Sequence, residues 1–475
     1  MKTSKLWIGG EHLEPTGGNY FEDLNPSDQA VIANVAKGTP ADIDRAVAAA
    51  VQAFATFSQT QAKEREAILC RAAALVERDR DEYLQLLIDE VGSPIMKAQF
   101  EVDYCINAFR AAAGVPRRLT GQTMPLDRPG AFGMSVREPV GVIACITPFN
   151  VPLLKNVKQI AMVIATGNTA VLLPSEFASQ VTVKFAETLA EAGTPAGVFN
   201  YVTGDPFEIG DSLTSHADVA AINFCGSPRI GKHVAELAAR DLKPVTLELG
   251  GKSPLVVLDD ADLDKALEAA TIGIFFFQGQ ACMASSRIIL QRGIADKFIA
   301  AYTEIAANIK IGDLSDPETA IGPIISPRQQ ARVKAHIDDA IAKGATLIHG
   351  AGEWQGACCP PTILSDVDES MSLCREETFG PVTSIYPVDT VEEALALAND
   401  TDYGLSFSLF TRDISTALNL ARGANAGMVH INAMSIQDEP HVPFGGNGLS
   451  GFGREGTDAD LDIMTRWKWI TVQLD

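Results

Sequence analysis

Residues 219–227, VAAINFCGS, form a short apolar run that ends in glycine and serine. Three earlier stretches have the same character: PVGVIACITP at 139–148, GNTAVLLP at 167–174 and VFNYVTG at 198–204, with helical patterns between them. Strands that alternate with helices predict a parallel sheet covered by helices, with ligands bound at the carboxyl ends of the strands. Residues 254–446 repeat this alternation. The sequence therefore predicts an α/β protein with two such units.

The composition narrows the class of protein. The chain has 475 residues, of which 46% are hydrophobic, so it can bury a large core without a disulfide or metal. The net charge of −22 repels phosphate backbones and anionic lipid, so we expect neither nucleic acid nor a membrane as a partner. The eight cysteines lack a disulfide spacing, and the seven histidines lack an HxxxH motif. We therefore expect reduced thiols in a cytoplasm and no metal site.

One cysteine is presented as a nucleophile would be. Cys282 lies in FFFQGQACMASSR, residues 275–287, where it follows a polar turn that contains Gly279. The small neighbours Ala281 and Ala284 leave room for a substrate carbonyl to approach the thiol. The alternative is a buried free cysteine that acts as a small hydrophobe. Two other polar stretches favour the nucleophile: TLELGGKSP at 246–254 and ITPFNVP at 146–152.

Together these three stretches resemble the NAD(P)-dependent aldehyde dehydrogenase family, and the resemblance extends from about residue 5 to 475. It implies an aldehyde dehydrogenase-like fold with two Rossmann-like α/β domains and a small β oligomerisation arm. The implied domains are a dinucleotide-binding domain at 1–118 and 138–249 with part of 447–462, a catalytic domain at 250–446, and an arm at 119–137 and 463–475. In this family the arm docks on a neighbouring subunit, so we expect a homodimer or homotetramer.

The resemblance also implies a mechanism. Cys282 attacks the aldehyde carbon as a thiolate. The Asn150 amide and the Cys282 backbone N–H stabilise the resulting oxyanion. Loss of hydride to the nicotinamide leaves a thioester, and Glu248 is the general base that activates water to hydrolyse it. Because Glu248 supplies a base for water, a coenzyme-A-acylating enzyme is disfavoured.

The cofactor residues follow from the same resemblance. The strand VAAINF delivers Gly226 and Ser227 to a helix start, which can receive the pyrophosphate of a dinucleotide. Glu176 would accept hydrogen bonds from the adenosine ribose and disfavour a 2′-phosphate, so NAD is expected rather than NADP. Glu377 would hold the nicotinamide ribose beside Phe379. The full expected set is Ile146, Thr147, Pro148, Phe149, Ser175, Glu176, Gly204, Gly210, Phe224, Gly226, Ser227, Ile230, Leu249, Gly250, Gln329, Glu377 and Phe379.

The chain departs from the family pattern at four positions. Leu173 stands where the family usually has lysine, and Pro228 where it commonly has threonine, so one ribose contact and one pyrophosphate donor are missing. Phe149 replaces the usual tryptophan before the oxyanion asparagine. Gln159 stands where lysine is common, with Lys158 directly before it.

Two other interpretations of glycine-rich stretches are rejected, and one of them concerns the same stretch that begins at Gly226. Residues 446–451 satisfy GxGxxG by letter but follow no βαβ strand. Residues 226–232 approach a P-loop, but His233 lacks the hydroxyl that a magnesium ligand at that position would supply.

The segment 430–446 bears on which aldehyde is the substrate. Residues 430–446, HINAMSIQDEPHVPFGG, look most like the branch of the family that acts on aromatic aldehydes such as benzaldehyde, salicylaldehyde and vanillin. An enzyme for aliphatic or amino aldehydes and semialdehydes is the alternative, and a non-catalytic dinucleotide-binding protein is a further one. By resemblance, the substrate pocket would be formed by Val151, Phe276, Met283, Met434, Ile436 and Phe444.

Overall fold

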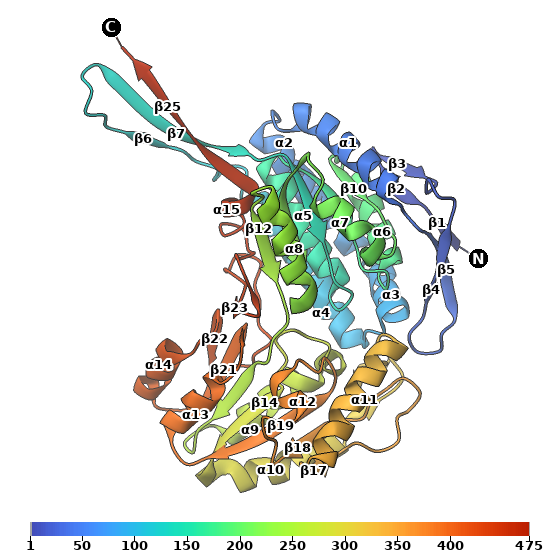
Figure 1. Cartoon of the computed structure of the whole chain (residues 1–475), viewed down its shortest axis with the longest axis vertical. Helices are drawn as coiled ribbons and strands as arrows, with labels where there is room; N and C mark the ends of the chain where they lie inside the picture. Colours follow the sequence, from blue (N-terminus) through green and yellow to red (C-terminus); the bar gives the residue numbers. More distant parts are fainter. Residues whose placement is uncertain (1, 475) are drawn as a thin grey trace.

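The first unit is built on an eight-stranded sheet with strand order β24-β12-β11-β8-β9-β10-β2-β3, in a computed structural model that describes residues 2–474 (Figure 1). Its central strands run parallel, as the alternation of strands and helices predicted. They are β8 (Val142–Ile146), β9 (Thr169–Leu173), β10 (Phe199–Tyr201), β11 (Val219–Cys225) and β12 (Val245–Glu248). The antiparallel strands at its edges are β24 (Gly451–Phe452), β2 (Leu6–Ile8) and β3 (Glu11–Leu13).

Helix α5 (Pro152–Thr166) is the innermost helix of this unit. All of its residues are buried, and it packs against α2, α4 and α6. Because no face of this helix reaches water, each polar side chain on it needs a partner within the protein. The other helices of the unit are α1 (Pro40–Phe57), α2 (Ala62–Arg78), α3 (Arg80–Val91), α4 (Ile95–Ala113), α6 (Ser179–Glu191), α7 (Pro206–Thr214) and α8 (Pro228–Arg240).

The second unit, coloured yellow to red in Figure 1, is built on a seven-stranded sheet of order β17-β18-β19-β14-β13-β21-β22. Only β17 (Thr346–His349) pairs antiparallel in this sheet. The parallel strands are β13 (Pro254–Val257), β14 (Arg287–Gln291), β18 (Thr362–Ser365), β19 (Val382–Val388), β21 (Ser406–Phe410) and β22 (Met428–Ile431). Its helices are α9 (Leu263–Phe275), α10 (Arg292–Ala307), α11 (Pro327–Ala342), α12 (Ser372–Arg375), α13 (Val391–Asn399) and α14 (Ile414–Gly423).

A three-stranded ribbon of order β25-β7-β6 projects from the body and ends near the C-terminus (Figure 1). The long strands β7 (Ala131–Pro139) and β25 (Thr465–Gln473) pair antiparallel along their length, and β6 (Gln122–Met124) pairs with the other edge of β7. The alternating patterns near both ranges predicted strands, and the structure adds that the two strands pair with each other. Within residues 2–474, β25 has a neighbouring strand on one side only.

The remaining elements are short. They are β1 (Lys2–Ser4), β4 (Tyr20–Leu24), β5 (Val31–Ala36), β15 (Lys310–Ile311), β16 (Thr319–Ile321), β20 (Tyr403–Gly404), β23 (Asn447–Gly448) and α15 (Leu461–Met464). Between residues 2 and 474, no helix has the length and apolar character needed to cross a membrane.

Candidate active site

Cys282 follows a left-handed turn at the end of α9. In this turn, η1 (Phe276–Gly279), the φ angles of Phe277, Gln278 and Gly279 are 50°, 45° and 69°. Residues other than glycine rarely adopt positive φ, and such strain persists only where surrounding contacts hold it. The contacts that hold this turn therefore fix the position of the thiol.

The side chain of Gln278 provides several of these contacts. Its amide nitrogen donates to the carbonyls of Gly92 (3.2 Å) and Pro323 (2.8 Å), and its amide oxygen accepts from the N–H of Gly322 (3.2 Å). Gly92 caps α3 in the first unit, whereas Gly322 and Pro323 follow β16. One glutamine thus connects the loop that carries Cys282 to both units.

Asn150 approaches the same loop from the first unit. It lies just beyond the carboxyl end of β8, and its amide Nδ2 donates to the backbone carbonyl of Gln280 (3.0 Å). The amide is buried and carries a second N–H, which can donate to a substrate oxygen. An oriented donor beside a nucleophile is the group that a developing oxyanion requires.

Glu248 ends β12, and its carboxyl group is enclosed by protein. The residue is 2% exposed, and neither carboxyl oxygen has a hydrogen-bond partner among residues 2–474. Burial raises the pKa of this carboxyl well above its usual range, although the ammonium of Lys155 opposes the rise. A carboxyl group whose pKa lies above its usual range is suited to exchange protons nearer to neutral pH.

A buried ion pair near Glu248 was not predicted. Lys155 on α5 lies 2.5 Å from Glu455, and the amide of Gln159 also donates to Glu455 (3.3 Å). Burial alone would lower the pKa of Lys155, but the Glu455 carboxylate holds that pKa well above its usual range, so Lys155 stays charged. The two partners are 300 positions apart in the sequence, so no local pattern links them.

The thiol of Cys282 rests in its protonated form. Burial raises the pKa of Cys282 above its usual range, and it raises the pKa of the neighbouring Cys225 to about 12. Because the thiolate is the nucleophile, a base must take the proton before attack. Glu248 pairs in register with Cys225 across β11 and β12, and its charge acts on Cys282. A carboxylate able to serve as that base is therefore present.

The residues predicted to bind a pyrophosphate lie at the start of a helix. Ser227 is the N-cap of α8, and Pro228 is its first residue, so one N–H donor is absent there as predicted. A Cβ at Gly226 would come 2.7 Å from the ring of Phe224, so only glycine fits at this position. The helix start fits an anionic group. Several other predicted residues follow the strands of the same sheet, namely Ile146, Thr147 and Pro148 at β8, Ser175 after β9 and Gly204 after β10.

Phe149 follows β8 and Glu176 follows β9. Because these strands are parallel neighbours, both residues lie at the carboxyl edge of the sheet. The Ser175 hydroxyl donates to the Glu176 carboxylate (3.4 Å), and burial raises the pKa of Glu176. The ring of Phe149 meets Phe177 (6.0 Å) and Phe379 (5.9 Å) edge to face. Phe149 and Phe379 are far apart in the sequence, and both were predicted to bind the cofactor. The fold brings their rings into contact.

Glu377 lies against the glycines that follow Glu248. The N–H of Gly251 donates to the Glu377 carboxylate (3.1 Å), and a Cβ at Gly250 would come 2.3 Å from the same group. Burial raises the pKa of Glu377 to about 7. The amide of Gln329 donates to the backbone carbonyl of Phe379 (3.0 Å) and holds this segment. The Glu377 carboxylate can accept hydrogen bonds from ribose hydroxyls, and Gly250 and Gly251 have no side chain that would block a dinucleotide.

The residues predicted to contact substrate come from both units. Ser435, beside the predicted Met434 and Ile436, donates to the backbone carbonyl of Met283 (2.7 Å) and joins their loop to the loop of Cys282. The ammonium groups of Lys155 and Lys158 lie over the ring of Phe444, at 4.9 Å and 4.3 Å from its centroid. Lys155 was not singled out in the sequence, and Lys158 was noted there only as the neighbour of Gln159.

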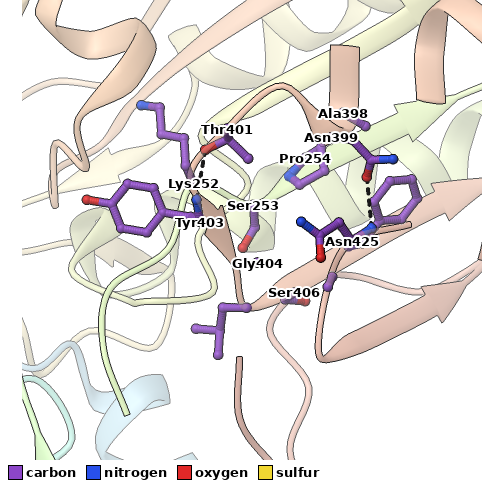
Figure 2. Close-up of a pocket in the computed structure, with 13 residues that line it drawn as sticks. Lys252, Ser253, Pro254, Ala398, Asn399, Thr401, Tyr403, Gly404, Ser406 and Asn425 are labelled. Atoms are coloured by element: carbon purple, nitrogen blue, oxygen red, sulfur yellow. Dashed lines mark hydrogen bonds between the residues drawn. The ribbon is translucent and has the colours of Figure 1, made fainter. Parts of the chain in front are cut away.

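Figure 2 shows a separate pocket in the second unit. Its wall includes Asn399, whose side chain accepts from the N–H of Asn425 (2.8 Å). The Lys252 side chain points away from this space, and burial together with the guanidinium of Arg287 lowers the pKa of Lys252 to about 7. None of the predicted site residues lines this pocket. A second space borders the site, between Ala281 and Glu377.

The two-unit α/β fold, with Cys282, Glu248 and Asn150 at one site, indicates the class of enzyme to which the chain belongs. The chain belongs to the aldehyde dehydrogenase family, which matches residues 12–470. It is 40% identical over 471 residues to a vanillin dehydrogenase of Pseudomonas fluorescens, covering 98% of this chain and 97% of that one. It is 39% identical over 477 residues to a salicylaldehyde dehydrogenase of Pseudomonas putida, covering 100% and 98%. The crystal structure of a salicylaldehyde dehydrogenase from Pseudomonas putida G7 complexed with salicylaldehyde matches with a TM-score of 0.97 and 38% identity, covering 100% of this chain and 98% of that one.

Proposed function

We propose that this protein oxidises an aromatic aldehyde to the carboxylic acid, with NAD as the preferred hydride acceptor. The observation that carries the proposal is that two segments reach the Cys282 loop. Asn150 of the first unit donates to Gln280, and Gly251, three residues after Glu248, packs against the backbone carbonyl of Cys282. The aromatic substrate is supported by the names of the two curated relatives and by the rings of Phe276 and Phe444 in the predicted pocket. The cytoplasmic location expected from the sequence stays a prediction.

The residues divide the chemistry among them. Glu248 takes the proton of Cys282, and the thiolate attacks the aldehyde carbon. The amide of Asn150 and the N–H of Cys282 donate to the oxygen as it gains charge. The bound nicotinamide supplies the hydride acceptor. After the thioester has formed on Cys282, Glu248 releases the thiol proton to solvent. The carboxylate then removes a proton from water, and the attack of water on the thioester releases the acid and the Cys282 thiolate.

A substrate panel tests the proposal. NADH formation is measured with benzaldehyde, vanillin and a short aliphatic aldehyde, each with NAD and with NADP. We expect the highest kcat/KM for the aromatic aldehydes with NAD. Turnover of the aliphatic aldehyde alone would retain the mechanism and reject the aromatic substrate, and absence of turnover with every aldehyde would favour a non-catalytic dinucleotide-binding protein.

The charge of Glu176 is expected to set the cofactor preference. Glu176→Gln removes the repulsion of a 2′-phosphate and weakens a charge-assisted hydrogen bond to the ribose, so the ratio of kcat/KM for NAD over NADP should fall by about tenfold or more. The measurement is the steady-state rate with each dinucleotide at saturating aldehyde. Glu187→Gln, an exposed site on α6, is the matched control. An unchanged ratio would remove Glu176 from the cofactor site.

We also propose that the ribbon of β25, β7 and β6 joins subunits into a homodimer or homotetramer. Trp467 and Trp469 on β25 are 52% and 65% exposed, and one edge of this strand is unpaired within residues 2–474. Exposed strand edges with apolar side chains favour pairing with another chain. The double variant Trp467→Glu/Trp469→Glu should therefore elute with a lower mass in light scattering. Ile414→Glu, at an exposed apolar site on α14, should not. Equal masses for all three proteins would reject the ribbon as the interface.

A further inference from the structure

Asp438 lies on the loop that carries three of the predicted substrate residues. Along this loop Gln437 and Glu439 are exposed, whereas Ile436 and the side chain of Asp438 turn inward. The Asp438 side chain is 8% exposed, which is unusual for a carboxylate. The loop thus carries a charged group toward the interior beside a residue already expected to line the substrate pocket.

Only one oxygen of the Asp438 carboxylate accepts hydrogen bonds from residues 2–474. Oδ2 accepts from the Tyr104 hydroxyl (2.8 Å) and from the Lys158 ammonium (2.6 Å). Oδ1 is buried and has no hydrogen-bond partner among residues 2–474. A buried charged acceptor without a donor is costly, and such a group calls for a specific explanation.

Aromatic rings lie next to the two partners of Oδ2. The ring of Tyr104 lies 6.3 Å from that of Phe100, which meets Phe276 edge to face at 5.8 Å. Lys158 also lies over the ring of Phe444, at 4.3 Å from its centroid. Phe100 is partly exposed on α4, so this group of rings extends from the surface to the interior. Such surroundings favour a flat apolar molecule that carries one hydrogen-bond donor.

The group lies close to the reacting residues. Ser435 of the Asp438 loop donates to Met283, the residue after Cys282 (2.7 Å). The charge of Lys158 acts on both Glu248 and Cys225. A substrate whose carbonyl meets Cys282 therefore has Asp438 and Lys158 in its neighbourhood.

We propose that Asp438 is a specificity-determining residue whose Oδ1 accepts a hydrogen bond from a phenolic hydroxyl on the ring of the aldehyde. Tyr104 and Lys158 are positioning residues that hold the carboxylate through Oδ2. This inference rests on the proposed function and narrows the substrate class to hydroxylated aromatic aldehydes. Vanillin and salicylaldehyde, named in the two curated relatives, both carry such a hydroxyl.

The test compares donors with non-donors on the same ring. We would measure kcat/KM for benzaldehyde, the three hydroxybenzaldehydes and the three methoxybenzaldehydes, at a pH at which the phenols are protonated. The wild type should prefer at least one hydroxylated isomer over its methoxy counterpart and over benzaldehyde by about tenfold or more, since a hydrogen bond to a charged acceptor is lost without the donor. Asp438→Asn should reduce that preference about tenfold, because kcat/KM should fall more for the hydroxylated isomer than for benzaldehyde.

Two further variants separate recognition from folding. Tyr104→Phe removes a donor to Oδ2 only, so it should retain most of the hydroxyl preference. Glu439→Gln, at the exposed neighbouring carboxylate, should match the wild type. A preference that survives Asp438→Asn, or an equal loss with all seven aldehydes, would overturn the inference and assign Asp438 a structural role. Turnover of benzaldehyde in that case would leave the proposed function intact, whereas absence of turnover with every aromatic aldehyde would reject both.

Discussion

Cys282→Ala is expected to reduce aldehyde oxidation by roughly 10⁴- to 10⁶-fold, the scale of loss when an enzyme loses its covalent nucleophile. The thiol lies at the end of the left-handed turn and faces groups from both units, so no other cysteine can replace it. The reduction is measured as NADH formation with the best aldehyde of the panel.

Two controls make this result specific. Cys70→Ala removes an exposed cysteine on α2 and should leave the rate unchanged. Labelling with iodoacetamide, followed by peptide mapping, should link inactivation of the wild type to modification of Cys282. A Cys282→Ala protein that retains even a tenth of the wild-type rate would exclude the cysteine mechanism.

Glu248→Gln is expected to reduce kcat by roughly 10²- to 10⁴-fold, the usual contribution of a general base. Because Glu248 is proposed to deprotonate both Cys282 and water, the pre-steady-state burst of NADH should also become slower. A burst at the wild-type rate, followed by accumulation of the thioester, would limit Glu248 to the activation of water. Rapid-mixing absorbance measures the burst, and mass spectrometry of the quenched protein detects the acyl group. Glu236→Gln, at an exposed site on α8, is the matched control.

The pH dependence gives a second readout of the same residue. Glu248 acts in its deprotonated form, and burial raises its pKa above the usual range. Activity of the wild type should therefore fall as the pH decreases through that raised pKa, at a higher pH than for an exposed glutamate. Glu248→Gln should lack this dependence. A wild-type profile that stays flat down to the pKa of an ordinary carboxylate, or a variant with the wild-type rate, would reject Glu248 as the base.

The fold could be predicted because its signals are local. The runs that became β8, β9, β10 and β11 are short and apolar, and the helices between them separate neighbouring parallel strands, so periodicity alone indicated the class. The candidate nucleophile Cys282 was indicated by its small neighbours together with the polar stretches at 146–152 and 246–254, and its catalytic role stays a prediction. The two long strands of the ribbon were also indicated by alternation, but their pairing joins residues that are far apart and carries no local signal.

The parts that sequence reasoning missed are contacts between distant residues. Lys155 and Glu455 are separated by 300 positions, and Tyr104 and Asp438 by 334. No periodic pattern links such partners. A turn before Cys282 was predicted, but its left-handed backbone at Phe277 and Gln278 was not. Phe277 disfavours positive φ, so the local preference of the sequence opposes the conformation that the fold imposes.

The position of Gln278 and Phe277 has a consequence for how this protein can be divided. Phe277 belongs to the second unit by sequence, yet its ring packs in the hydrophobic core of the first, beneath the ammonium of Lys97 (4.2 Å). The loop that carries the Cys282 thiol therefore lies at the interface between the two units, and contacts from both units hold it. A fragment cut near residue 250 would keep Cys282 but lose Gly92 and Lys97, and its thiol would react as an ordinary cysteine until the missing fragment was added back. Recovery of activity on mixing the two fragments would thus report the docking of the halves directly.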